Sequence, residues 1–258
     1  MRNSLIYFCL FLHTLFFIGL FLTFHSRINE EQKLQSQIQS KLVDSFALVE
    51  ITGEEFTKTC IDGLCADTRI NDLEISGSGV ILDDGIILTA GHVCDSYLEF
   101  KKSFEEKTTS QSFDTMTITT SKKAWLIVSN DDGARVSAKV RKISDKSDLC
   151  LIVAPGITSD EKIEIAKSHV DRGSFVWTAT APSGIFTPGM ILMYQGKYMG
   201  RAEFSDYYTM PSRPGSSGSP ILNRNGELVG ITFAANRNLE MINIAVPVED
   251  IRLFLGLP

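Results

Sequence analysis

From Ser45 onward the sequence consists of short apolar runs broken by glycine, asparagine and aspartate. Such runs predict many short β-strands joined by tight turns, which is typical of an all-β sandwich or barrel. Two-residue hairpin signals recur, for example Asp62-Gly63 and Asn225-Gly226. About six strands are expected before a linker near 155–170 and about six after it. The sequence therefore predicts two six-stranded antiparallel β-barrels, over 45–155 and 170–247, with a short C-terminal helix.

Residues 5–24 form an apolar run that a few polar residues interrupt. At about 1.5 Å per residue, such a helix spans roughly 30 Å, the thickness of a bilayer core. The alternative is a cleaved signal peptide, but no small-residue cleavage site follows the run. We therefore expect a cytoplasmic tip and transmembrane anchor over 1–26. The chain would then be a single-pass membrane protein whose body lies on the extracytoplasmic side, periplasmic or extracellular.

The segment from Arg27 to Phe46, which includes the stalk region 27–44, is polar, with apolar residues at every fourth position: Leu34, Ile38, Leu42 and Phe46. This spacing predicts one apolar stripe along a helix. We expect a helical stalk, followed by a single domain over 45–258. The stripe either packs on that domain or pairs with a second copy of the chain, and the spacing leaves a homo-oligomer open.

Two cysteines, Cys60 and Cys65, flank the Asp62-Gly63 hairpin signal. A turn there places them directly opposite each other, at a separation that suits a disulfide. This bond would put the body outside the reducing cytosol; the alternative is two free thiols in a surface loop. Cys94 and Cys150 are expected to be small buried apolar residues; a second bond between them is conceivable, but nothing in the sequence supports it.

Composition excludes several classes of function. The chain is 43% hydrophobic and 22% charged, with a formal net charge of −6. A nucleic-acid surface would normally show a clustered basic face, so no nucleic-acid partner is expected. No group of His, Cys and Asp has ligand spacing, so neither a metal nor another cofactor is expected. The polar segment 97–121 predicts a long surface insertion.

The heptapeptide Pro214–Pro220 (Pro-Gly-Ser-Ser-Gly-Ser-Pro) is suited to expose the hydroxyl of Ser217. Glycine permits the positive φ angles and close backbone approach of an anion-binding turn, and proline stiffens both ends. Such a run is more often an ordinary loop. A serine hydroxyl is barely ionised at neutral pH, so a nucleophilic Ser217 needs a neighbouring base.

His92 is the best candidate for that base, because it directly follows an apolar strand. His13 and His25 belong to the N-terminal apolar segment, and His169 lies in a polar linker. The base in turn needs an acid to orient it. Asp148 adjoins an apolar run and is preferred over Asp145, which is typical of a turn.

The candidates occur in the order His92, Asp148, Ser217. Nucleophile-elbow hydrolases have the order Ser, acid, His, and subtilisin-type enzymes have Asp, His, Ser. The order found here is that of the chymotrypsin-type double barrel. Motif order and expected strand count therefore favour the same fold.

Segments 77–93, 145–149 and 214–220 resemble the trypsin-like serine proteases of the HtrA/Deg type, and the resemblance covers about residues 45–255. It implies that His92 is the general base, Asp148 its orienting acid and Ser217 the nucleophile. It also implies an oxyanion hole formed by the N–H groups of Gly215 and Ser217. Substrate-binding residues would be Pro211 and the strand residues Ile231, Thr232, Phe233 and Ala234, with an apolar preference before the cut.

The sequence departs from the HtrA pattern at Ser216 and Ser219, which replace the usual Asn and Gly. HtrA-type enzymes usually carry a peptide-binding PDZ module after the protease domain, and we expect none after Pro258. The function expected from the resemblance is a membrane-anchored serine endopeptidase that cleaves polypeptides. Two alternatives remain: a non-catalytic module of the same fold that binds peptides or a partner, and an esterase that uses the same three residues.

Overall fold

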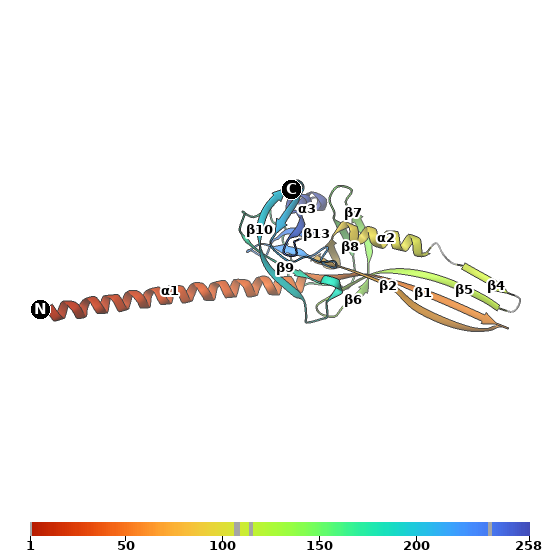
Figure 1. The fold of residues 1–258 in the computed structure, drawn as a ribbon, viewed down its shortest axis with the longest axis horizontal. Helices are drawn as coiled ribbons and strands as arrows, with labels where there is room; N and C mark the ends of the chain where they lie inside the picture. The colour runs from red at the N-terminus through yellow and green to blue at the C-terminus, as the bar shows by residue number, and fades with distance from the viewer. Residues whose placement is uncertain (1, 106–108, 114–115, 237–238) are drawn as a thin grey trace.

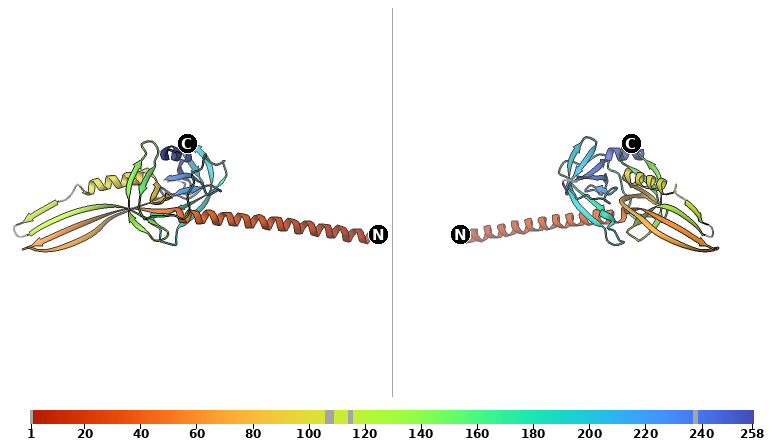
Figure 2. Two further views of the ribbon diagram at one scale, coloured as in Figure 1. Left: turned by 180° about the vertical axis from the view of Figure 1, so that it is seen from behind. Right: turned by 45° about the vertical axis from the view of Figure 1, so that its right-hand side comes forward.

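The computed structural model describes residues 2–105, 109–113, 116–236 and 239–258 (Figure 1). A long N-terminal helix, α1 (Arg2–Ser45), leads into a β-rich body. Figures 1 and 2 show that the helix leaves the body on one side, while a narrow β-ribbon projects from the other. The molecule is therefore mostly β, as expected, with few helices.

The first half of the body is one antiparallel sheet and a helix. Its elements are β1 (Phe46–Ile61), β2 (Leu64–Asp83), β3 (Ile86–Thr89), α2 (Gly91–Glu105), β4 (Thr109–Phe113), β5 (Met116–Asn130), β6 (Arg135–Ser137), β7 (Lys139–Ile143) and β8 (Cys150–Val153). The strand order is β4-β5-β1-β2-β3-β8-β7, with β6 paired to β5 beside this path. The expected closed barrel over 45–155 is therefore not confirmed.

Long strands explain this difference. β1, β2 and β5 have 16, 20 and 15 residues, so their outer parts run past the core and form the projecting ribbon (Figure 1). The expected surface insertion at 97–121 is the rest of α2, together with β4 and the start of β5, which extend the ribbon. At its tip, Cys60 pairs with Cys65 and forms the expected disulfide.

The second half is a closed six-stranded barrel of order β10-β11-β14-β13-β12-β9, which confirms the expectation for residues 170–247. Its elements are β9 (Phe175–Thr180), η1 (Pro182–Gly184), β10 (Leu192–Ala202), β11 (Ser205–Tyr208), β12 (Pro220–Leu222), β13 (Leu228–Ala235) and β14 (Asn243–Pro247). The expected C-terminal helix follows as α3 (Val248–Leu255).

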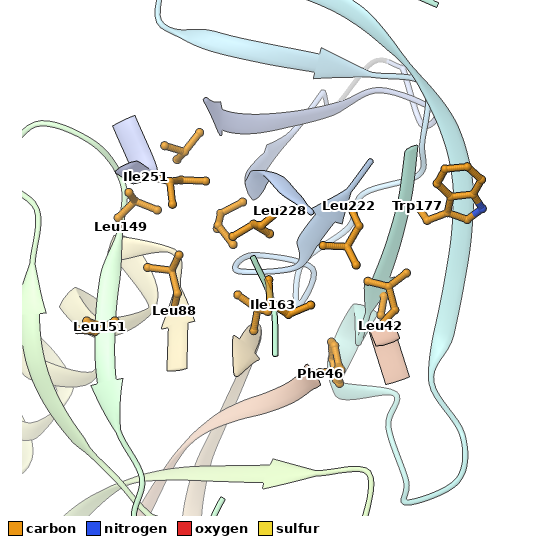
Figure 3. Packing of buried hydrophobic residues seen from close by; sticks show 14 of the residues in the cluster. Leu42, Phe46, Leu88, Leu149, Leu151, Ile163, Trp177, Leu222, Leu228 and Ile251 are labelled. Atoms are coloured by element: carbon orange, nitrogen blue, oxygen red, sulfur yellow. The ribbon is translucent and has the colours of Figure 1, made fainter. Parts of the chain in front are cut away.

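A shared apolar cluster, the seam, joins the sheet and the barrel (Figure 3). From the sheet side it includes Leu88, Leu149 and Leu151, and from the barrel side Trp177, Leu222 and Leu228. Alternation along each strand sends one set of side chains into this seam and the other into the sheet or barrel interior. The seam holds the sheet and the barrel in a fixed relation, and the candidate site lies across it.

The C-terminal turns of α1 belong to the body. Ile38 and Leu42 are only 2% and 0% exposed, and Leu34 packs against the same cluster. Figure 3 shows Leu42 and Phe46 beside the barrel residues of the seam. Of the two alternatives for the stripe, packing on the body is therefore the one observed.

The predicted membrane anchor is contradicted. In the part of the chain that the structure describes, no helix carries a stretch that is both long enough and apolar enough to span a bilayer. Such a span needs about 20 consecutive predominantly apolar residues. The expected anchor over residues 5–24, the cytoplasmic tip and the single-pass extracytoplasmic localisation are therefore wrong.

Candidate active site

His92 is placed by the junction between β3 and α2. β3 lies between β2 and β8 in the sheet, and Thr89 at its end pairs with Cys150. α2 begins two residues later at Gly91, so His92 lies in its first turn. A Cβ atom on Gly91 would lie 2.7 Å from Asp148 Oδ1. Glycine there lets the helix start approach the segment that carries the acid.

Asp148 contacts His92 with both carboxylate oxygens. Oδ1 accepts the backbone N–H of His92 at 2.7 Å, and Oδ2 lies 2.6 Å from His92 Nδ1. Because a carboxylate only accepts hydrogen bonds, Nδ1 carries the proton and Nε2 is left as an acceptor. His92 Nε2 lies 2.8 Å from the hydroxyl oxygen of Ser217. The structure thus brings the three predicted residues together in one hydrogen-bonded row.

Three hydrogen bonds fix the loop that carries Ser217 to the strands β2 and β13. Ser78 of β2 donates its backbone N–H to Ser217 O at 2.7 Å and its hydroxyl to Gly215 O at 2.9 Å. Gly218 N–H donates to Thr232 O of β13 at 2.7 Å. Gly218 has φ 93°, and a Cβ there would lie 1.8 Å from Ser78 O. No other residue type fits this position without moving the backbone.

Ser78 was not predicted as a site residue. It also accepts the N–H of Ala181 on its hydroxyl at 3.1 Å, so one buried side chain links β2, the Ser217 loop and the segment after β9. The signal available in the sequence was a small polar residue between Gly77 and Gly79. Its partners are more than 100 residues away, so local spacing could not reveal the role.

The N–H groups of Gly215 and Ser217 point away from the hydrogen bonds that the preceding carbonyl groups accept. Pro214 O accepts the N–H of Ser183 at 2.7 Å, and Ser216 O accepts that of Ser219 at 3.1 Å. In a trans peptide the N–H points opposite to the preceding C=O. The N–H of Gly215 therefore points away from Pro214 O, and the N–H of Ser217 points away from Ser216 O. Within the described chain, neither of these N–H groups donates a hydrogen bond. Both N–H groups are thus available as donors in the loop that carries Ser217.

The pKa of His92 is raised above its ordinary value of 6.5. The hydrogen bond to Asp148 is the main cause, partial burial opposes it, and the charges of Asp148 and Asp95 add to the rise. The imidazolium form is therefore stabilised by its surroundings. Among the described residues, no group of three or more His, Cys, Asp or Glu is placed to hold a metal ion.

The predicted substrate-binding residues differ in burial and in strand pairing. Ile231 is fully buried in the seam, and Thr232 is fully buried beside Asn243, whose amide nitrogen lies 3.0 Å from the threonine hydroxyl. Pairing of β13 with β12 ends at Ile231, whereas pairing with β14 continues to Ala235. Residues 233–235 thus have one edge without a strand partner in the described chain. Pro211 is half-buried in the segment before the Ser217 loop.

A second disulfide joins Cys94 and Cys150, so the expectation of two separate buried thiols is wrong. Both cysteines are fully buried, as expected. Their Cα atoms lie 6.3 Å apart although 56 positions separate them in the sequence. The pairing depends on the packing of α2 against β8, which residue spacing does not reveal.

Comparisons with known proteins agree with this geometry. The Trypsin-like peptidase domain family matches residues 77–231, which is more than half of the chain. Human serine protease HTRA4 is 27% identical over 194 residues, which cover 70% of this chain and 34% of that protein. Serine protease HTRA1 of Xenopus laevis is 28% identical over 191 residues, which cover 70% of this chain and 36% of that protein. The chain thus spans about a third of the length of these relatives.

A solved structure shows the same fold. The crystal structure of Rv3671c from M. tuberculosis H37Rv, a serine-to-alanine mutant in its inactive form, matches with a TM-score of 0.54. The match covers 85% of this chain and 88% of that one at 12% sequence identity, so it bears on the fold alone. With the family match and the HtrA-type relatives, the conclusion is that this chain belongs to the trypsin-like peptidases, and that its resemblance within them is to HtrA-type serine proteases.

Proposed function

We propose that the chain is a serine endopeptidase that hydrolyses polypeptides through an acyl-enzyme on Ser217. One observation carries the proposal: Ser217 Oγ lies 2.8 Å from His92 Nε2, while Asp148 Oδ2 lies 2.6 Å from His92 Nδ1. A serine, a base and an orienting acid within hydrogen-bond reach are the arrangement that activates a hydroxyl.

The reaction follows from the positions of the protons. As Ser217 Oγ bonds to the scissile carbonyl carbon, its proton moves to His92 Nε2, and Asp148 stabilises the resulting imidazolium. The N–H groups of Gly215 and Ser217 donate to the developing oxyanion. His92 then gives the proton to the leaving amine as the C–N bond breaks. Water, deprotonated by His92, attacks the acyl-enzyme and releases Ser217 with its proton.

The unpaired edge of β13 supports a peptide as the substrate. An extended chain laid along residues 233–235 would add a strand to the barrel beside the Ser217 loop. Main-chain hydrogen bonds of this kind fix the register of a polypeptide without selecting its sequence. An ester without a peptide backbone could not use them, which favours endopeptidase over esterase activity.

The test is digestion of an unfolded polypeptide, such as reduced and alkylated casein, followed by mass spectrometry of the new termini. The wild-type chain should generate internal cleavages, and Ser217→Ala should generate none. Turnover of a small ester without peptide cleavage would favour the esterase, and binding of casein without either reaction would favour a non-catalytic module. A homo-oligomer stays a prediction, which sedimentation of the full chain would test.

A further inference from the structure

The Cys94–Cys150 disulfide lies next to the two residues that orient each other at the candidate site. Cys94 follows His92 by two positions in the first turns of α2, and Cys150 follows Asp148 by two positions at the start of β8. We propose that this disulfide is a positioning element of the candidate active site, which holds His92 against Asp148. The inference deepens the proposed function and rests on it.

The contact between His92 and Asp148 tolerates little movement. The carboxylate receives both the backbone N–H and the ring of the same histidine, at 2.7 and 2.6 Å. Both bonds are made only if the start of α2 and the segment before β8 keep one relative position. A shift of about 1 Å would lengthen both bonds beyond hydrogen-bond range. Misplacements of that size cost on the order of 100-fold in rate.

The disulfide is the covalent link between the start of α2 and β8, and the apolar contacts of the helix with the sheet are non-covalent. The helix buries Val93 and Tyr97 in the sheet core, but His92, Asp95 and Leu98 are exposed. Beyond this contact the helix continues along the projecting ribbon, away from the seam (Figure 1). A covalent bond in its first turns therefore fixes the end that carries the base.

The disulfide is shielded from solvent. Both cysteines are 0% exposed and lie within the apolar core of the sheet. The Cys60–Cys65 disulfide differs, since it closes the tip of the ribbon between residues that are five positions apart. It belongs to the same sheet but touches no residue of the candidate site, so it offers a matched control.

The pKa of His92 distinguishes a positioning role of the disulfide from a purely stabilising role. Titratable groups that act on His92 are Asp148, from the segment before β8, and Asp95, from α2, while Ser217 presents its hydroxyl. The bond to Asp148 keeps the pKa of His92 above 6.5. If the Cys94–Cys150 disulfide is removed, the hydrogen bond between His92 and Asp148 lengthens, and the pKa of His92 falls towards its ordinary value.

The experiment compares the wild-type chain, Cys94→Ala/Cys150→Ala, and the control Cys60→Ala/Cys65→Ala. The second-order rate of Ser217 labelling by a fluorophosphonate is measured against pH, per folded molecule. Loss of the Cys94–Cys150 disulfide should lower the labelling rate on the order of 100-fold. It should also move the midpoint of the acid limb down towards 6.5. The control should match the wild-type chain in both respects. Unchanged rate and midpoint in Cys94→Ala/Cys150→Ala would overturn the proposal.

Two further measurements cover the remaining cases. If Cys94→Ala/Cys150→Ala does not fold, Cys60→Ala/Cys65→Ala refolded under reductant loses only the Cys94–Cys150 bond and keeps both of its sulfur atoms, and the same two quantities decide. If the wild-type chain does not label at all, the proposed function fails. NMR titration of His92 then tests the positioning role of the disulfide by itself. A lower His92 pKa without the disulfide supports this role, and an equal pKa overturns it.

Discussion

The two carboxylate oxygens of Asp148 contact different groups of His92. Oδ2 faces the ring, and Oδ1 accepts the backbone N–H at the start of α2. Replacing Asp148 with Asn removes the acceptor that fixes the protonated Nδ1. We expect a loss of activity of about 10⁴-fold with the fold retained, because the ring then takes the wrong tautomer.

This prediction is measured as the rate of peptide hydrolysis against pH. The acid limb of Asp148→Asn should move down from above 6.5, because the main cause of the raised His92 pKa is gone. Asp145→Asn is the control, since Asp145 lies three residues away in the same turn region. A large loss in Asp145→Asn with normal activity in Asp148→Asn would show that the acid has been misassigned.

Ser219 is fully buried, and its hydroxyl has no hydrogen-bond partner among the described residues. A buried hydroxyl without a partner lowers stability by about 1–3 kcal/mol. Ser219→Ala should therefore raise the free energy of unfolding by about 1 kcal/mol, as measured by urea denaturation. The matched control is Ser45→Ala, since the Ser45 hydroxyl is buried but donates to Lys41 O at 2.7 Å. A gain from Ser45→Ala with none from Ser219→Ala would contradict this account.

At the scale of single residues, the sequence predicted what local context reveals. His92 follows an apolar strand, Asp148 precedes one and Ser217 lies between glycines, so each carried its own signal. Ser78 carried only the weak signal of a small polar residue between two glycines, and the Cys94–Cys150 bond carried none, because both roles depend on contacts across long separations.

Among the elements, α3 is tied to the barrel by an ion-pair network. Glu249 of α3 accepts from Arg201 of β10 at 2.6 Å and lies 3.1 Å from His169. Partial burial by itself would raise the pKa of Glu249, but the bonds from Arg201 and His169 outweigh it and lower the pKa to about 2. The carboxylate form is thus favoured by folding.

This shift predicts an acid sensitivity. A carboxyl whose pKa is lower in the folded state stabilises the fold above its unfolded pKa, and that stability is lost as the pH falls. For Glu249 the loss lies between the ordinary value of 4.5 and about 2. In thermal unfolding, the melting temperature of the wild-type chain should fall more steeply over this range than that of Glu249→Gln. Parallel curves would rule out the coupling.

Strand boundaries were predicted well where an apolar run marks the strand and poorly where the strand continues through polar residues. The expected strand Phe46–Thr52 continues as β1 to Ile61, through a polar stretch without an apolar signal. Cross-strand pairs support this extension: Glu55 with Lys122 at 2.6 Å, and the hydroxyls of Thr57 and Thr120 at 3.3 Å. Such pairs form only after distant strands meet, so a reading of one segment cannot detect them.

At the scale of the whole molecule, α1 is part of the body as well as an extension from it. Leu42 is fully buried between the helix and the barrel (Figure 3). Leu42→Ala should lower the free energy of unfolding by about 2–5 kcal/mol, because it leaves a cavity in the seam. Urea denaturation measures this, with the exposed residue Gln39→Ala as control. Equal stability of the two variants would show that the stripe does not pack on the body.

Sequence alone did not decide the large-scale arrangement. It predicted two barrels, but closure of a sheet depends on which distant strands pair, and only the second half closes. It left open what the apolar stripe of α1 packs against, because an apolar face predicts that the face is buried but does not identify its partner. It also predicted a membrane anchor from residues 5–24, which the structure contradicts.

In the proposed mechanism, His92, Asp148 and Ser217 act as one nucleophilic unit. The most direct measurement that tests this mechanism is intact-protein mass spectrometry after exposure to a fluorophosphonate, followed by mapping of the modified peptide. We predict one adduct per chain, on Ser217, with labelling abolished in Ser217→Ala and strongly slowed in His92→Ala. A correctly folded wild-type chain that takes up no adduct, or one that is labelled equally well without Ser217, would contradict the account.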